Sequence, residues 1–106
     1  MLSRLFLPAI FLLAGTLAAS ALTPAEQRGR RFALNNCAQC HSIDKVTASP
    51  LAIAPPFREL HKRYPVSTLA EAFAEGIQTG HPTMPEFQLE PDQINDLLRF
   101  MQTLEK

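Results

Sequence analysis

One short run, "CAQCH" from Cys37 to His41, constrains this chain more than any other feature. It contains the chain's only two cysteines, Cys37 and Cys40, and His41 follows them at once. Four chemistries use Cys-x-x-Cys: a structural disulfide, a redox-active thiol pair, part of a zinc site, and covalent attachment of a haem. Each needs different surroundings, so the rest of the chain must select among them.

Residues 1–21 have the pattern of a secretory signal peptide. Arg4 supplies a basic start, Leu5 to Ala14 form an apolar block, and Ala19-Ser20-Ala21 places small residues where a signal peptidase cleaves. Cleavage there leaves 85 residues, which is 106 minus 21. We therefore expect a single domain over residues 22–106, exported and soluble after cleavage.

The alternative interpretation of this segment is an uncleaved membrane anchor. A helix that spans a bilayer needs about 20 steadily apolar residues. Pro8 and Gly15 interrupt the apolar block, and Ala19-Ser20-Ala21 offers a cleavage site. The pattern therefore favours cleavage, with no membrane attachment of the mature chain.

The charge balance excludes one class of partner. The full chain has 10 basic and 10 acidic residues, and loss of Arg4 leaves 9 basic residues (10 minus 1) against 10 acidic ones. A nucleic-acid-binding domain normally carries a strong excess of basic residues on one face. We therefore expect no nucleic-acid partner.

Three helices are predicted after the signal peptide. The first starts with a capping box at Thr23–Glu26. The second runs from Ser67 to about Ile77, with Gly80 placed to end it or to open the next turn. The third starts at Glu90–Pro91, and a short helix is possible at residues 57–64. Since no segment alternates with period two, the predicted fold is all-α, with long proline-rich loops.

The apolar residues of this small chain fall mainly in three short segments. A chain of about 85 residues buries a limited core and often needs a staple or a cofactor to remain folded. We therefore expect something other than protein to fill the middle of the fold.

The surroundings of the cysteine pair favour haem attachment. A Cys-x-x-Cys disulfide closes a very short loop and so adds little stability. A redox-active pair belongs at a helix N-terminus after a strand, whereas Cys37 and Cys40 follow a helix. A structural zinc site needs four ligands, and His61 and His81 are 20 residues apart. Cys-x-x-Cys-His is the attachment signature of c-type haem, in which His41 can bind the iron.

If His41 binds the iron on one face of the ring, Met84 is the leading candidate for the other face. Met84 lies in a loop, between Thr83 and Pro85, and belongs to no helical stripe. Met101, by contrast, continues the apolar stripe of the last helix and is expected to pack in the core. His81, three residues before Met84, and His61 stay open as alternative ligands.

At this point the sequence resembles the small, single-haem class I cytochromes c of bacteria. The resemblance is carried by "CAQCH" (37–41), "APPF" (54–57) and "GHPTMPEF" (80–87), together with the positions of the first and last helices. It covers essentially the whole mature chain. It implies the cytochrome c fold, with three main helices and long loops wrapped around one covalently attached haem.

The resemblance also implies roles for individual residues. Cys37 and Cys40 would hold one haem c through thioether bonds, with His41 and Met84 as ligands of the iron. The carbonyl of Pro55 would accept a hydrogen bond from Nδ1 of His41, with Pro56 as the next candidate. Gly29 would pack the first helix against the last, where Leu97, Phe100 and Met101 can supply the opposing face. Ala33 departs from the family pattern, which places a bulky residue there.

The function implied is that of a one-electron carrier and not of an enzyme. Its partners would be an electron donor protein and an acceptor protein, neither of which the sequence identifies, and the carrier itself would be a monomer. The first alternative is a tightly bound electron-transfer subunit of a periplasmic dehydrogenase. The second is a ligand-binding or peroxidatic haem protein in which Met84 is displaced from the iron.

Overall fold

The computed structural model describes residues 3–10, 21–78 and 83–105. Within these ranges the chain is helical and contains no strand. The elements in chain order are α1 (Pro24–Asn36), the 3₁₀ helices η1 (Phe57–Lys62) and η2 (Val66–Thr68), α2 (Leu69–Glu75) and α3 (Pro91–Thr103). The prediction of an all-α fold with three main helices is confirmed.

Two sequence predictions fall partly outside the described residues. One is the signal-peptide cleavage site, of which Ala19 and Ser20 are not described, and the other is the Gly80–His81 part of the loop before α3. Residues 3–10 are exposed and form no helix. In the ranges that the structure describes, no helix has the length and apolar character needed to cross a membrane.

Both long helices begin with the signals that the sequence carries. At α1, the Thr23 hydroxyl accepts from the Glu26 amide at 3.2 Å, and the Glu26 carboxylate accepts from the Thr23 amide at 2.8 Å. This reciprocal capping box satisfies two amides that the first helical turn leaves unpaired. At α3, Glu90 and Gln93 form a corresponding box, with Pro91 at the first helical position.

The second predicted helix is shorter than the sequence indicated. The chain forms η2 first, and the α-helix that follows ends at Glu75, so its predicted extension to about Ile77 is wrong. Gly76 takes a φ of 102°, a conformation that side-chain-bearing residues rarely adopt. Beyond it, the Ile77 amide donates to the Phe87 carbonyl at 2.9 Å, which pairs this segment with the chain that leads to α3. Gly76, and not Gly80, is therefore the glycine that ends the helix.

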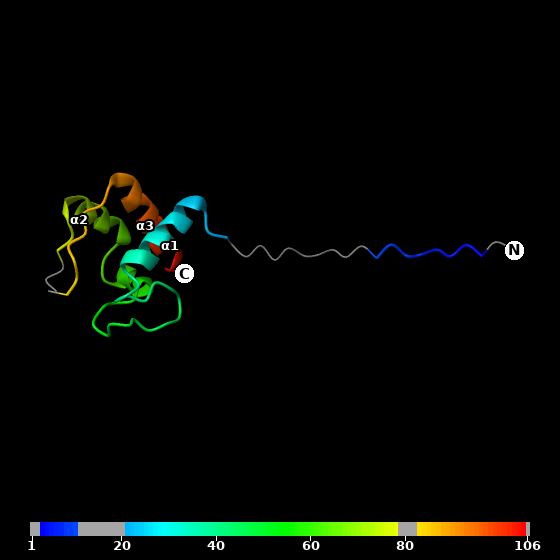
Figure 1. Ribbon diagram of the computed structural model, residues 1–106, viewed down its shortest axis with the longest axis horizontal. Coiled ribbons are helices and arrows are strands. Elements are labelled where there is room, and N and C mark those ends of the chain that lie inside the picture. Colours follow the sequence, from blue (N-terminus) through cyan, green and yellow to red (C-terminus); the bar gives the residue numbers. More distant parts are fainter. Residues whose placement is uncertain (1–2, 11–20, 79–82, 106) are drawn as a thin grey trace.

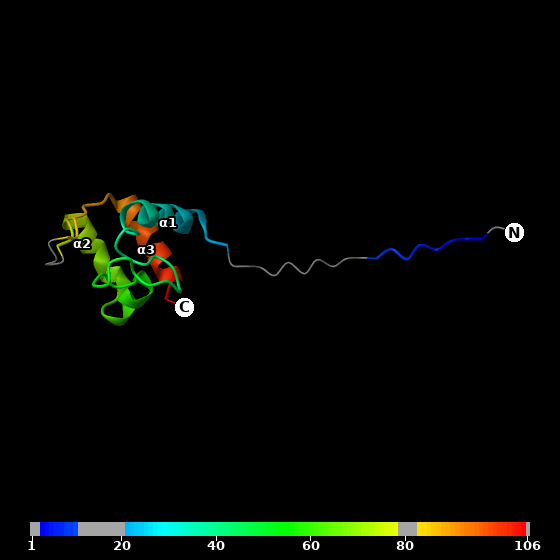
Figure 2. The same cartoon turned by 60° about the horizontal axis from the view of Figure 1, so that its bottom comes forward.

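α1 and α3 cross each other and form the centre of the domain (Figures 1 and 2). α2 packs on α3 near the start of that helix, and the loop between α1 and η1 lies beneath the C-terminal end of α1 (Figure 1). The buried core draws on all the helical elements. Its members are Ala33, Phe57, Leu60, Val66, Leu69, Phe73, Ile94, Leu97, Leu98, Phe100, Met101 and Leu104.

The crossing of the two long helices depends on Gly29. A Cβ at this position would overlap the backbone carbonyl of Asp96 and lie 2.8 Å from Cβ of Phe100. The absence of a side chain therefore allows α1 and α3 to approach closely. Ala33, one turn further along α1, is fully buried, so its small side chain suits the same close crossing.

Candidate functional site

The Cys-x-x-Cys-His run forms a tight turn at the end of α1. Cys37 is the C-terminal cap of the helix, and its amide still donates to the Ala33 carbonyl at 2.8 Å. Its own carbonyl accepts from the amides of Cys40 at 3.2 Å and His41 at 2.9 Å. The run therefore continues the helical path for about one turn, which gathers the two thiols and the imidazole at one end of α1.

His41 makes a hydrogen bond that fixes its ring. Its Nδ1 lies 2.8 Å from the carbonyl oxygen of Pro55. Because a carbonyl oxygen can only accept, Nδ1 must carry the hydrogen and donate it. In neutral imidazole the other nitrogen, Nε2, then keeps a free lone pair, the form in which histidine binds a metal. The hydrogen bond therefore sets both the tautomer and the orientation of a potential metal ligand.

The two thiols do not form a disulfide. Cys37 and Cys40 are both free and half-buried, and Cys37 packs against the hydrophobic core. Burial raises the pKa of the Cys37 thiol to about 11 because the thiolate is poorly solvated there. Redox-active cysteines instead have a lowered pKa, usually at a helix N-terminus. The C-terminal position on α1 and the raised pKa both argue against a thiol–disulfide oxidoreductase.

Phe57 packs against His41 from the following segment. The ring centroids are 5.2 Å apart with an interplanar angle of 47°, and Phe57 is a member of the buried core. The Phe57 amide also donates to the carbonyl of Ser42 at 2.9 Å. The sequence analysis assigns Phe57 no role at the site beyond its place in "APPF". The signal that could have found it is its position two residues after Pro55, which brings its ring to the imidazole.

Met84 lies half-buried in the segment between α2 and α3. Phe87 and Leu89, three and five residues after Met84, are anchored to α2 and its C-terminal end. The Leu89 amide donates to the carbonyl of Phe73 at 2.9 Å, and the Phe87 carbonyl accepts from the Ile77 amide at 2.9 Å. These bonds fix the position of the chain from Phe87 onward, three residues after Met84. That Met84 serves as an iron ligand opposite His41 stays a prediction.

The alternative ligands lie in different situations. His81 is outside the described residues. His61 belongs to η1, and within the described chain its Nδ1 is buried without a hydrogen-bond partner. The described residues contain no group of three or more His, Cys, Asp or Glu side chains arranged to hold a metal ion. A zinc site at Cys37 and Cys40 thus finds no support in this part of the chain.

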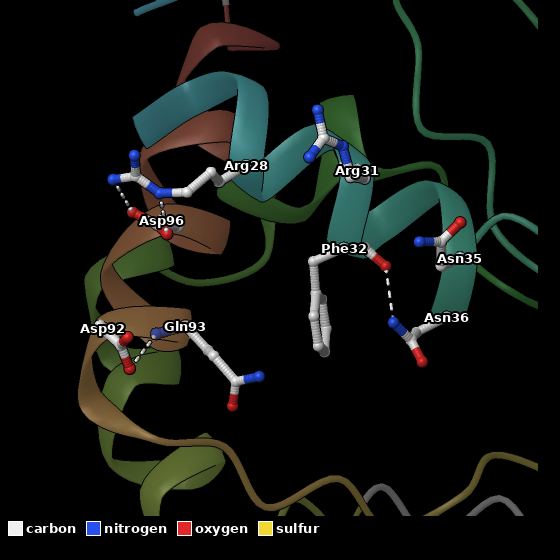
Figure 3. Close-up of a pocket in the computed structure, with 8 residues that line it drawn as sticks. All are labelled: Arg28, Arg31, Phe32, Asn35, Asn36, Asp92, Gln93 and Asp96. Atoms are coloured by element: carbon white, nitrogen blue, oxygen red, sulfur yellow. Dashed lines mark hydrogen bonds and ion pairs between the residues drawn. The ribbon is translucent and has the colours of Figure 1, made fainter. Parts of the chain in front are cut away.

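A separate hollow of about 350 Å³ lies on the outer side of the α1–α3 crossing (Figure 3). Arg28 of α1 binds Asp96 of α3 there through two hydrogen bonds, Nε to Oδ2 at 2.8 Å and Nη2 to Oδ1 at 3.2 Å. The ion pair raises the pKa of Arg28 and lowers that of Asp96. No predicted haem residue lines this hollow, which instead marks where charge reinforces the helix crossing. Its lining is Arg28, Arg31, Phe32, Asn35, Asn36, Asp92, Gln93 and Asp96.

An all-α domain with a Cys-x-x-Cys-His turn at the end of its first helix, and a carbonyl bound to the histidine Nδ1, has the features of a c-type cytochrome. Comparison with known families agrees, because residues 26–105 match the family model described as Cytochrome c. The chain belongs to the cytochrome c family. Neither the curated proteins nor the solved structures compared with it gave a match. Family membership implies haem-based electron transfer.

The residues of the site fit a covalently bound haem. Two free thiols at Cys37 and Cys40 are available for thioether bonds. His41, next in the chain, has Nδ1 bound to Pro55 and therefore offers Nε2 to the iron. An imidazole nitrogen is the usual protein ligand of haem iron. The donor chemistry of this chain is that of a c-type haem site.

Proposed function

We propose that this protein is an exported one-electron carrier that holds one haem c on Cys37 and Cys40. His41 and Met84 are the two protein ligands of its iron. The carrier works in the periplasm as a monomer, after removal of residues 1–21, between a donor protein and an acceptor protein. The observation that carries the proposal is the 2.8 Å hydrogen bond from Nδ1 of His41 to the Pro55 carbonyl.

The hydrogen bond suits an electron carrier for two reasons. It prevents the His41 ring from rotating, so that the ligand geometry stays the same in both oxidation states. It also increases the electron-donating strength of Nε2 toward the metal. The haem, when bound, supplies the reversible gain and loss of one electron. With both His41 and Met84 bound to it, the iron would have no position left open for a substrate.

Other residues near the site restrict the motion of His41 and shield it from water. Phe57 packs beside the His41 ring at 5.2 Å and belongs to the buried core, so it excludes water from that side. The close α1–α3 crossing at Gly29 fixes the helix that ends in the cysteine turn. Such rigidity favours electron transfer, because little of the coordination shell must rearrange when the charge changes.

Optical spectra of the oxidised and reduced protein, produced with a haem-attachment system, test this proposal. Covalent haem is recognised by its sharp reduced α-band, and methionine ligation by a weak ferric band at the red end of the visible spectrum. The Met84→Ala variant should lose the ferric band and keep covalent haem. Met101→Leu is the matched control, because Met101 is buried in α3 and should keep the band. A wild type with haem but without the band, or a Met84→Ala variant that keeps it, would overturn the ligand assignment, and His81→Ala would then be examined.

Two further measurements separate the alternatives. Carbon monoxide binds iron only where a ligand position is vacant or readily vacated. The reduced protein should therefore fail to bind it rapidly at neutral pH, whereas rapid binding would favour the peroxidatic or ligand-binding function. A monomer in gel filtration at low concentration fits a free carrier, while co-purification with a larger subunit would favour a fixed subunit of a dehydrogenase.

A further inference from the structure

The side chain of Arg58 is bound inside the loop that follows His41. Its Nη1 donates to the carbonyl of Thr47 at 2.7 Å, to the hydroxyl of Ser42 at 3.2 Å and to the carbonyl of Asp44 at 3.3 Å. Arg58 is the second residue of η1 and is half-buried. The guanidinium of an arginine on a solvated helix face is surrounded by water. The guanidinium of Arg58 instead forms hydrogen bonds with three acceptors of one loop.

The acceptors that Arg58 meets are held in place by the loop itself. The Asp44 carboxylate accepts from the amides of Val46 at 2.8 Å and Thr47 at 2.7 Å, and from the Thr47 hydroxyl at 2.6 Å. These local bonds close the loop as an Asx-type turn. The turn therefore holds the carbonyl of Thr47 in a fixed position, where Arg58 can bind it.

Ser42 connects this loop to the segment that carries Pro55. Ser42 is polar but buried, with 3% of its surface exposed. Its amide donates to the Ser49 hydroxyl at 3.0 Å, its hydroxyl lies 3.0 Å from that of Thr47, and its carbonyl accepts from Phe57 at 2.9 Å. Ser42 is thus fixed on one side to the loop and on the other to the residue before Arg58.

Both ends of the His41–Pro55 hydrogen bond adjoin these contacts. His41 directly precedes Ser42, and Pro55 lies two residues before Phe57. The segments 41–47 and 55–58 are therefore joined by two kinds of link: the Phe57–Ser42 backbone bond and the Arg58 side chain. A change in the distance between these segments would change the distance from Nδ1 to the Pro55 carbonyl.

We propose that Arg58 is a positioning residue for His41: by joining the two segments, it keeps the Pro55 carbonyl at hydrogen-bond distance from Nδ1. The inference rests on the proposed function, in which His41 binds the haem iron, and it adds a residue that controls that ligand without touching it. An apolar side chain at position 58 leaves two carbonyls and the Ser42 hydroxyl without their donor. Because Asp44 and Thr47 are exposed, water takes the place of the lost donor at their carbonyls. The loop is then no longer tied to η1, and the Nδ1 bond is weakened.

The test is hydrogen exchange of the His41 Nδ1–H in the reduced haem protein, followed by NMR. Exchange of a bonded proton reports how often its bond opens. Arg58→Leu should speed exchange of this proton by about tenfold or more, while the backbone amide of Leu97 in the α3 core stays within about twofold. Arg58→Lys keeps a positive charge and several donors, so it should restore most of the protection.

Two controls separate positioning from charge and from general stability. Arg30→Leu removes the same charge from an exposed site on α1, and Val66→Ala weakens the buried core at η2. Neither should speed exchange at His41 relative to Leu97. If Arg58→Leu does not fold, Asp44→Ala loosens the same loop from its other side and should also speed exchange selectively at His41.

The outcomes distinguish this inference from the function on which it rests. A wild-type protein without covalent haem would overturn the proposed function, and the inference with it. A haem protein in which Arg58→Leu leaves His41 exchange unchanged would overturn the positioning role alone. An equal acceleration at His41 and Leu97 would also overturn it, because it would show that Arg58 only stabilises the fold.

Discussion

Gly29 of α1 lies directly against the backbone carbonyl of Asp96 in α3, so closely that even a methyl group would overlap it. The same Asp96 uses its carboxylate to bind Arg28, the residue before Gly29. One residue of α3 therefore contacts α1 twice, through its backbone at the close approach and through its side chain at the rim. The helix that ends in the cysteine turn is positioned by this crossing.

Gly29→Ala should destabilise the protein despite the better helix propensity of alanine. Alanine is favoured over glycine in a helix interior by about 1 kcal/mol. Overlap with Asp96 and Phe100 opposes this gain, and overpacking of this kind typically costs about 1–3 kcal/mol. We expect a net loss of stability in urea unfolding of the haem protein, followed by circular dichroism. Arg30→Ala, at an exposed site on the same helix, should change stability by less than about 0.5 kcal/mol, and a Gly29→Ala variant as stable as wild type would contradict the close packing.

Phe57 should affect both stability and the environment of His41. Truncation of a buried phenylalanine to alanine costs about 3–5 kcal/mol, and Phe57→Leu should cost much less because most of the volume remains. Both variants remove the ring that lies beside the imidazole, so both should shift the NMR signals of the His41 side chain. Phe73→Leu, in the buried face of α2, is the control. The predicted contact would be wrong if Phe57→Leu and Phe73→Leu disturbed the His41 signals equally.

Asp44 should contribute to stability in a defined acidic range. Hydrogen bonds from Thr47 and Val46 lower the pKa of its carboxyl from 3.8 to about 2. A group with a lowered folded-state pKa stabilises the protein above its unfolded-state pKa and loses that contribution as the pH falls through the folded-state value. The stabilisation is therefore fully present above about pH 4 and disappears toward pH 2.

Denaturant unfolding at neutral pH and at about pH 3 checks this. Asp44→Ala should destabilise the protein at neutral pH and reduce the difference in stability between the two conditions. Glu105→Ala is the control, because it removes an exposed carboxylate near the C-terminus and leaves the turn at Asp44 intact. It should leave the acid dependence of stability unchanged. An acid dependence that stays unchanged in Asp44→Ala would show that other carboxylates account for it.

Folding should depend on covalent attachment of the cofactor. The described core is small, and Cys37 packs against it. We expect Cys37→Ala combined with Cys40→Ala to leave residues 22–106 largely unfolded, because the haem supplies apolar surface that the chain itself lacks. Far-ultraviolet circular dichroism measures the helix content. Near-native helicity in that double variant without haem would refute the prediction.

The sequence alone determined the parts of this protein whose signals are local. The capping box at Thr23, the prolines that open α1 and α3, and the apolar stripe of α3 predict helices because each acts within one or two turns of chain. The "CAQCH" run indicated the cofactor for the same reason, since its chemistry requires five consecutive residues. Both bounds of α2 were misjudged. The chain forms η2 before the helix, and at its end Gly76 adopts a positive φ and the returning chain pairs with Ile77.

Tertiary structure decided the contacts that join distant parts of the chain. The distance between Nδ1 of His41 and the Pro55 carbonyl, expected only from the family resemblance, is set by how residues 42–57 fold back on themselves. The link from Arg58 to Thr47 has no local sequence signal, because neither partner can be recognised from its neighbours. The packing of Gly29 against the last helix was expected only from the family resemblance, and its contact with the Asp96 backbone was not expected. Local rules act over a few residues, whereas these contacts depend on the relative placement of whole segments, which only packing of the complete fold determines.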